Sequence, residues 1–138
     1  MDGFRIDPDA LETPSTQIVA GVLDALCAGR LTTGDQLPSV RALAAHLGVN
    51  TNTVGRAYAE LERLDVVEGR RGSGVYVSSR GALRASRIRR RATLRAFERA
   101  SNVALRAGHP PSVLVDTLER LTALEPTSSD SARSQGRT

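Results

Sequence analysis

Residues 38–77 read PSVRALAAHLGVNTNTVGRAYAELERLDVVEGRRGSGVYV, and this stretch decides the fold. Ser39 is a favoured helix N-cap, and apolar residues follow it at helical spacing until Gly48, a residue typical of a left-handed turn. Asn50 is a second N-cap. The helix after it carries one regular apolar stripe, made of Val54, Ala57, Tyr58, Leu61 and Leu64. Two short helices joined across a glycine turn predict a helix-turn-helix.

Two β-like runs end the stretch. Residues 66–67 and 75–77 are rich in β-branched and aromatic side chains, which favour strands. Between them residues 68–74 read EGRRGSG, and a connection so rich in glycine is typical of a hairpin. The stretch therefore predicts a mainly α fold with a small β-hairpin after the second helix.

The outward face of the second helix suits DNA better than a protein core. Its first turn carries Thr51, Asn52 and Thr53, at the end where recognition helices touch base edges. Asn pairs with adenine through two hydrogen bonds, and Thr bonds a base or rests its methyl group on thymine. Arg56 follows on the same face and could reach a base or a phosphate. A solvated helix face usually carries Glu and Lys, and this face has neither before Glu60, so we favour a DNA-reading helix.

Further candidates for DNA contact are a glycine and several arginines. Gly55 stands inside the second helix, where glycine costs about 1 kcal/mol relative to alanine. Close approach to a DNA backbone and a mildly unfavourable surface residue explain it about equally well. Arg41, off the apolar stripe of the preceding helix, fits a phosphate contact, although an arginine there is more often simply solvated. At the hairpin tip, Arg70, Arg71 and Gly72 fit a phosphate or minor-groove contact, with a plain basic turn as the alternative.

The charge is distributed unevenly along the chain. The net charge is +4, and all 19 basic residues are arginines. Residues 1–78 hold seven arginines against ten acidic residues, whereas residues 79–106 hold nine arginines against one acidic residue. Attraction of the DNA-reading module for DNA must therefore come from arginines placed on one face. A helix predicted over 83–107 carries one stripe of arginines: Arg84, Arg87, Arg91, Arg95 and Arg99. Three interpretations stay open for this stripe: a solvated helix face, contact with a DNA backbone or contact with an acidic partner.

The rest of the chain is arranged around a predicted winged-helix domain of residues 14–78. Residues 1–13 are polar and predict a flexible N-terminus, and residues 14–28 add a first helix. Cys27 in that helix is expected to be buried as a small hydrophobe. Residues 79–124 predict two helices, and residues 125–138 predict a disordered tail because they lack periodicity and apolar residues.

The two C-terminal helices carry apolar stripes outside the predicted core. Short helices alone bury little apolar surface, so we expect a second copy to cover these stripes in a twofold homodimer. The expected dimerisation residues are Ile88, Ala92, Ala96, Ala100, Val103, Leu114, Leu118 and Leu121.

Four motifs occur in order and in register over residues 17–77: LPS-x-R, LA-x-x-LGV, NTV-x-RAY-x-x-LE and RRG-x-G-x-YV. The chain therefore resembles the DNA-binding signature of the GntR family of bacterial transcription regulators. Its short C-terminal part is similar to that of the YtrA-like subfamily, where this part serves mainly for dimerisation. The resemblance implies a winged helix, with the hairpin of residues 66–77 as the wing. It also implies a homodimeric repressor that binds a palindromic operator in double-stranded DNA.

The resemblance implies residue roles as well. The family's DNA-contacting positions correspond to Arg41, Asn50, Thr51, Asn52, Thr53, Arg56, Arg71 and Gly72. Asp65 departs from the family, which usually has Gly at the end of this helix. Asp tolerates the left-handed conformation better than most residues, so we expect the turn to survive.

Other classes of function find little support in the sequence. His46 and His109 lack neighbouring ligands at metal-binding spacing, so no metal and no other cofactor is expected. No combination of nucleophile, base and orienting acid stands out in the sequence, so we expect the protein to have no enzymatic activity. No apolar run approaches the roughly 20 residues that cross a bilayer, and no signal pattern opens the chain, so a cytoplasmic location follows by default. The remaining alternative is a winged helix that serves as a protein-interaction or replication module. A small-molecule effector is compatible with the sequence, but nothing identifies one.

Overall fold

The computed structural model describes residues 4–124, so the tail predicted over residues 125–138 lies outside the described part. The chain forms two compact units, divided between Thr93 and Leu94. The elements in chain order are α1 (Pro14–Cys27), α2 (Val40–Leu47), α3 (Thr51–Arg63), β1 (Val67–Arg70), β2 (Gly74–Val77), α4 (Gly81–Arg106) and α5 (Pro111–Leu124). None of the described helices combines the length and the apolar character needed to cross a membrane.

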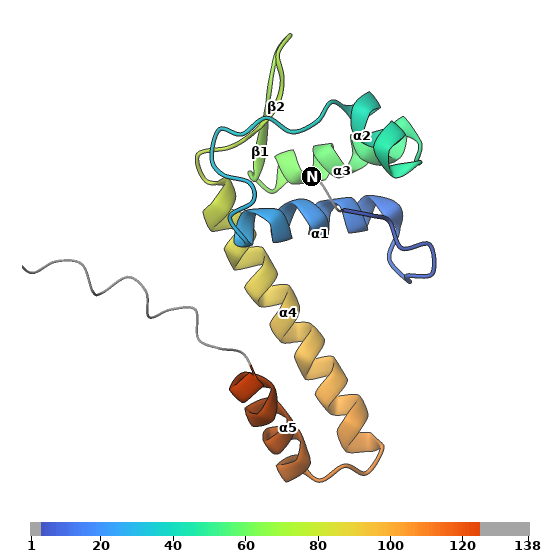
Figure 1. Cartoon of the computed structure of the whole chain (residues 1–138), viewed down its shortest axis with the longest axis vertical. Coiled ribbons are helices and arrows are strands. Elements are labelled where there is room, and N and C mark those ends of the chain that lie inside the picture. The colour runs from blue at the N-terminus through green and yellow to red at the C-terminus, as the bar shows by residue number, and fades with distance from the viewer. Residues whose placement is uncertain (1–3, 125–138) are drawn as a thin grey trace, which may run out of the picture. The chain divides into compact units, whose positions relative to one another are not determined.

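The core of the first unit is built on α1 and α3, which lie side by side (Figure 1). Ile18 and Val22 from α1 and Val54 and Leu61 from α3 have no exposed surface. Within each helix these residues are four or seven positions apart, so each helix turns a single face inward.

Cys27 departs from the prediction of burial, because its side chain is exposed. It is the last residue of α1 and follows the buried Leu26 by one position. One residue rotates the side chain by about 100° around the helix, which carries it off the face that meets the core.

The ends of α2 and α3 confirm the helix-turn-helix. The Ser39 hydroxyl accepts a hydrogen bond from the backbone N–H of Ala42 (3.1 Å), as an N-cap does. Gly48 ends α2 in the left-handed conformation with φ 67°. The Asn50 side chain then accepts a hydrogen bond from the backbone N–H of Asn52 (2.8 Å) and starts α3.

The predicted hairpin is confirmed as an antiparallel pair of strands, in which Val67 lies opposite Val77. Both valines are buried and fasten the base of the wing to the core. On its other edge, β2 meets the loop between α1 and α2 through a bridge between Gln36 and Tyr76. The first unit is therefore a winged helix, as the sequence predicts.

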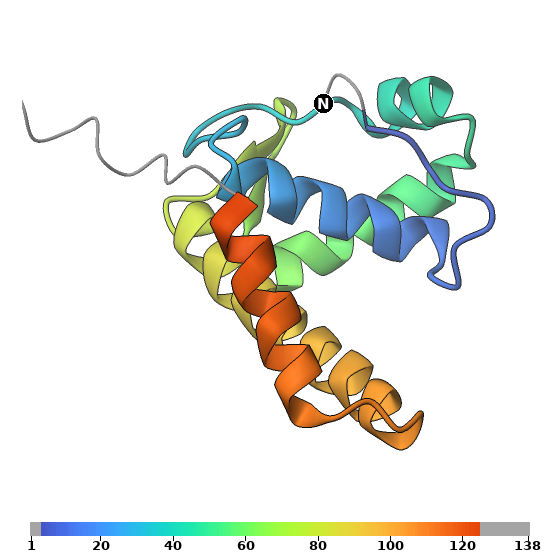
Figure 2. The same ribbon diagram turned by 60° about the horizontal axis from the view of Figure 1, so that its bottom comes forward.

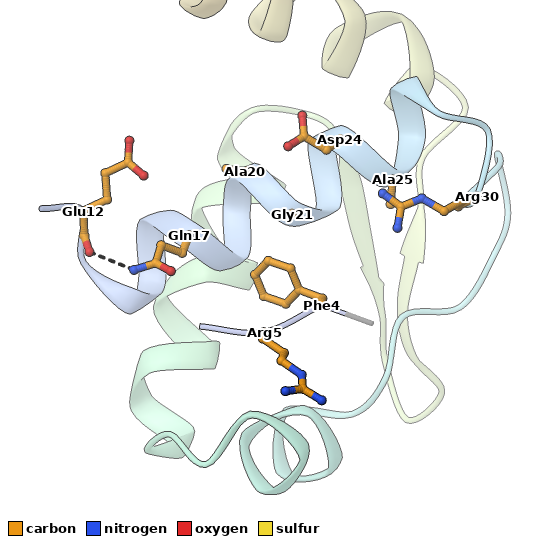
Figure 3. Close-up of a pocket in the computed structure, with 9 residues that line it drawn as sticks. All are labelled: Phe4, Arg5, Glu12, Gln17, Ala20, Gly21, Asp24, Ala25 and Arg30. Atoms are coloured by element: carbon orange, nitrogen blue, oxygen red, sulfur yellow. Dashed lines mark hydrogen bonds between the residues drawn. The ribbon is translucent and has the colours of Figure 1, made fainter. Parts of the chain in front are cut away.

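Residues 4–13 pack against the rest of the first unit, where the sequence predicted a flexible segment. The ring of Phe4 lies over Gly21 of α1 (Figure 3). Ile6 packs against the core. The backbone N–H of Asp7 donates to the Gln17 side chain (2.9 Å), and the Gln17 amide donates back to the Asp7 carbonyl oxygen (3.0 Å). These contacts join residues that are ten or more positions apart in the sequence. The polarity of residues 1–13, on which the prediction of flexibility rested, does not reveal such contacts.

The turn between α3 and the wing takes the left-handed form expected for Asp65, whose φ is 59°. The hydroxyl of Ser78 donates a hydrogen bond to the Asp65 carbonyl oxygen (2.8 Å). The Asp65 carboxylate lies 3.8 Å from Arg80 and 3.8 Å from Arg84 at the start of α4. The residue that departs from the family pattern thus connects the end of α3 with the beginning of α4.

The first half of α4 belongs to the first unit, which extends to residue 93 rather than to the predicted boundary at residue 78. Gly81 and Ala85 are buried. Ile88, which we assigned to the dimerisation stripe, packs against the core of its own chain because it shares a helix face with Ala85. An ion pair between Arg89 and Asp24 of α1, with an Nη2–Oδ2 distance of 3.3 Å, holds the same stretch of helix.

The second unit consists of the remainder of α4 and α5, joined by a turn in which Gly108 has φ 93° (Figure 2). No side chain of α5 is buried. Ala92, Ala96 and Ala100 are exposed as well. The large apolar residues exposed in this unit are Leu94, Phe97, Val103, Leu105, Val113, Val115, Leu118, Leu121 and Leu124.

Candidate nucleic-acid interface

The first turns of α3 present polar side chains to solvent. Thr51, Asn52 and Arg56 are exposed, and Thr53 is half-buried beside them. The cap formed by Asn50 uses only the backbone N–H of Asn52, and no hydrogen bond joins the Asn52 side chain to any other residue of 4–124. The carboxamide of Asn52 is therefore available for a base edge. The side-chain oxygen of Asn50, in contrast, already accepts the capping hydrogen bond.

Gly55 has no packing role within the described chain. A Cβ built at this position would meet no heavy atom within 4 Å. Alanine would therefore fit in the isolated protein and would suit a helix better by about 1 kcal/mol. The space beside Gly55 lies next to the exposed Arg56 on α3.

Tyr58 fixes α3 relative to the entry of α2. Its side chain is 5 % exposed, and its hydroxyl donates a hydrogen bond to the carbonyl oxygen of Pro38 (2.7 Å). Burial raises the pKa of the Tyr58 hydroxyl to about 12. Sequence reasoning placed Tyr58 in the core stripe but missed this bond, because Pro38 is remote in sequence.

Several exposed arginines of the first unit carry charge that no carboxylate of residues 4–124 neutralises in an ion pair, and Arg41, Arg56 and Arg71 are among them. These three come from α2, α3 and the turn of the wing. Arginine suits phosphate because its planar guanidinium donates two parallel hydrogen bonds.

Arg70 differs from its neighbour Arg71. Its guanidinium lies 4.3 Å from the centre of the Tyr76 ring and 3.1 Å from the Glu68 carboxylate. The Tyr76 hydroxyl in turn lies 2.5 Å from the hydroxyl of Ser73. Both arginines are exposed, but Arg70 has partners within the wing, whereas Arg71 has no ion pair within residues 4–124 and lies beside the left-handed Gly72 (φ 72°).

Two open cavities lie along the N-terminal segment and share Phe4 and Arg5. One, of about 510 Å³, has Arg5, Arg30, Glu12 and Asp24 on its walls (Figure 3). The other, of about 440 Å³, reaches His46 and Leu47 at the end of α2. Within residues 4–124, no three of the side chains that bind metals, His, Cys, Asp and Glu, gather in one place.

Comparison with known proteins gives concordant matches. The sequence model of "Bacterial regulatory proteins, gntR family" matches residues 14–77. Over 75 residues the chain is 42% identical to the HTH-type transcriptional repressor YtrA of Bacillus subtilis (strain 168), a match that covers 54% of this chain and 58% of the repressor. The structure is similar to that of a GntR family transcriptional regulator from Listeria monocytogenes, with a TM-score of 0.71, 27% identity and coverage of 83% of this chain and 98% of the other.

A second solved structure is YtrA from Sulfolobus acidocaldarius, a GntR-family transcription factor. The TM-score is 0.52 and the identity is 33%, over 63% of this chain and 95% of that chain. Against the first curated relatives, the aligned part of this chain spans 64%, 58% and 55% of their lengths, which is less than two thirds in each case.

Proposed function

This chain belongs to the GntR family of bacterial regulatory proteins, and on that premise we propose that it is a DNA-binding transcription regulator that acts as a homodimeric repressor on a palindromic operator. The observation that carries the proposal is the exposed start of α3, where Thr51, Asn52 and Arg56 have no partner within the described chain. This surface, which lies beside a glycine without a packing role, suits base edges in a major groove.

The recognition helix α3 enters the major groove with its N-terminal end. Asn52 reads a base edge there, with Thr51 and Thr53 beside it, and the absent side chain of Gly55 lets the helix come close to the DNA backbone. Arg41 and Arg56 bind phosphates on either side and fix the register of the helix. The wing places Arg71 and Gly72 at the neighbouring minor groove.

A second copy covers the apolar surface of the second unit. Leu94 and Phe97 of α4 and Leu118 and Leu121 of α5 are each about half exposed, at 46% to 59%. Exposed apolar clusters of this kind mark association surfaces. A twofold dimer of this type presents two recognition helices to half-sites one helical turn apart, or a multiple of it.

Repression follows when the bound dimer occupies a promoter, which requires a cytoplasmic protein in contact with the chromosome. The B. subtilis relative is named a repressor, which supports repression over activation here.

The test is titration of labelled promoter-proximal duplex DNA, taken from the region upstream of the coding gene, with the full-length protein. Random duplex of the same length is the control. Binding at least a hundredfold tighter to one promoter-proximal segment, with protection of an inverted repeat, supports a specific regulator. Equal and weak binding to both duplexes would favour a winged helix used as a protein-interaction or replication module.

A further inference from the structure

Side chains from outside the wing hold it on both of its sides. On the first strand, the carboxylate of Glu62 on α3 accepts a hydrogen bond from the backbone N–H of Gly69 on β1 (3.1 Å). A Cβ at Gly69 would lie 3.3 Å from that carboxylate oxygen, so the glycine permits the close approach. The recognition helix is thereby bonded directly to the first strand of the wing.

At the tip, the side chain of Gln36 reaches the wing from the loop between α1 and α2. Its amide nitrogen donates a hydrogen bond to the carbonyl oxygen of Ser73 (3.0 Å). Gly74 has φ 134°, a conformation that favours glycine, and a Cβ there would lie 2.7 Å from the same nitrogen, so a larger residue would displace the Gln36 side chain. The backbone of Leu37 adds a bond to the Val75 carbonyl oxygen (2.8 Å) and keeps this loop against β2.

We infer that Glu62 and Gln36 are positioning residues that set the wing against the recognition helix, so that Arg71, and not Arg70, is the cation that the wing delivers to DNA. This inference rests on the proposed function. Arg70 stacks on Tyr76 and pairs with Glu68, and it stiffens the wing from within. Arg71 has no ion-pair partner among residues 4–124 and sits at the turn that the two outside bonds hold.

The physical consequence is pre-organisation. A two-stranded hairpin alone is marginally stable in water, so an unbraced wing would have to be ordered when DNA binds. The bonds from Glu62 and Gln36 order it beforehand and reduce the entropy lost on binding. The hydrogen bonds made by Glu62 and Gln36, which we call the braces, therefore strengthen DNA binding through Arg71 although neither residue touches DNA.

The experiment is a double-mutant cycle on operator affinity, measured by fluorescence anisotropy with the full-length protein. Glu62→Met removes the acceptor, and Glu62→Gln, which keeps an acceptor oxygen, is the charge-matched reference. Gln36→Met removes the donor at nearly constant size. Each Met variant is expected to weaken binding roughly two- to tenfold, Glu62→Met relative to Glu62→Gln and Gln36→Met relative to the wild type. In an Arg71→Ala background, both losses should vanish, because the braces act through Arg71.

Thermal unfolding of every variant separates wing placement from loss of the fold. A loss of the same size in the Arg71→Ala background would overturn the inference while leaving the proposed function intact. Unchanged affinity of the Met variants in the wild-type background would do the same. A wild-type protein that discriminates no promoter-proximal DNA would overturn the proposed function and the inference with it.

Salt dependence distinguishes the two wing arginines. A residue that neutralises a phosphate contributes about −0.9 to the slope of log affinity against log salt concentration. Arg71→Ala should lower the magnitude of the slope by about 1 per protomer, and Arg70→Ala should leave it unchanged. The reverse assignment of these slopes would refute the roles given to Arg70 and Arg71.

Discussion

The hydroxyl of Tyr58 donates a hydrogen bond to the carbonyl oxygen of Pro38 across 2.7 Å, which joins the middle of the recognition helix to the residue before the cap of α2. The two helices of the helix-turn-helix are therefore linked by a polar contact as well as by their apolar faces. Tyr58→Phe should lower the free energy of unfolding by about 1 kcal/mol, because it removes one buried hydrogen bond and keeps the ring. Urea denaturation measures the change, and an unaltered midpoint would show that the bond contributes nothing.

The same tyrosine should make stability depend on alkaline pH. Its pKa is about 12 in the folded protein against an ordinary value of 10.0, so the folded state retains the proton more strongly. The resulting stabilisation is complete below pH 10 and is lost as the pH rises from about 10 to about 12. Over that window the wild type should lose roughly 2 kcal/mol more than Tyr58→Phe. Parallel pH profiles for the two proteins would contradict this expectation.

Asn52→Ala should weaken operator binding by roughly 1–3 kcal/mol and relax the preference at one base pair. Its melting temperature should stay unchanged, because the side chain is exposed and has no partner within residues 4–124. Competition with operators changed at single positions measures the preference. Lower stability together with intact specificity would make Asn52 a structural residue.

Two glycines provide a matched pair of alanine substitutions. Gly55→Ala meets open space and should stabilise α3 by up to about 1 kcal/mol while it weakens operator binding. Gly81→Ala would place a methyl group 2.6 Å from the Val66 carbonyl oxygen, and it should destabilise the protein by roughly 1–3 kcal/mol. Chemical denaturation and anisotropy on both variants test the pair. A Gly55→Ala protein with wild-type affinity would remove the argument for close DNA approach.

The full-length protein should sediment as a dimer at micromolar concentration. Leu118→Asp places a charge on the exposed apolar surface of α5 and should shift the protein toward monomer, with much weaker binding to a full operator because avidity is lost. Leu11→Asp, at a fully exposed leucine of the N-terminal segment, is the control and should remain a dimer. Dimerisation unaffected by Leu118→Asp would place the interface elsewhere.

Affinity for the operator should fall on the order of 10³-fold between 50 and 200 mM salt, if Arg41, Arg56 and Arg71 of each protomer contact phosphates. The estimate counts only these three arginines, each of which is exposed and lacks an ion pair within the described chain. Affinity that hardly changes over this range would exclude phosphate contacts as the main source of binding.

The winged helix could be predicted from the sequence because its signals are local. The caps at Ser39 and Asn50 and the stripe from Val54 to Leu61 each depend on residues within a turn or two of one another, and the structure confirms them. The same locality explains the left-handed turn at Asp65. The DNA-contacting residues remain predictions that await the measurements above.

The contacts that sequence reasoning missed join distant segments. Phe4 on Gly21 and Gln36 on Ser73 leave no periodic trace, because each pair is set by how elements pack. We assigned Ile88 to the dimerisation stripe, but it packs against the core of its own chain. A helical stripe shows which residues share a face, but it does not show which neighbour covers that face. Phe97, exposed on α4, was overlooked because it lies off the alanine-rich stripe.

The seat of Phe4 on Gly21 bears on how the protein should be handled in the laboratory. An affinity tag fused directly at Met1 would begin only three residues before Phe4 in the sequence, so we expect bulky or charged tag residues to compete with the packing of the Phe4 ring on α1. Side chains introduced at Gly21 by mutagenesis would push the ring out in the same way. A tag at the carboxyl terminus, or an N-terminal tag separated by a Gly/Ser spacer, keeps that contact intact during purification and measurement.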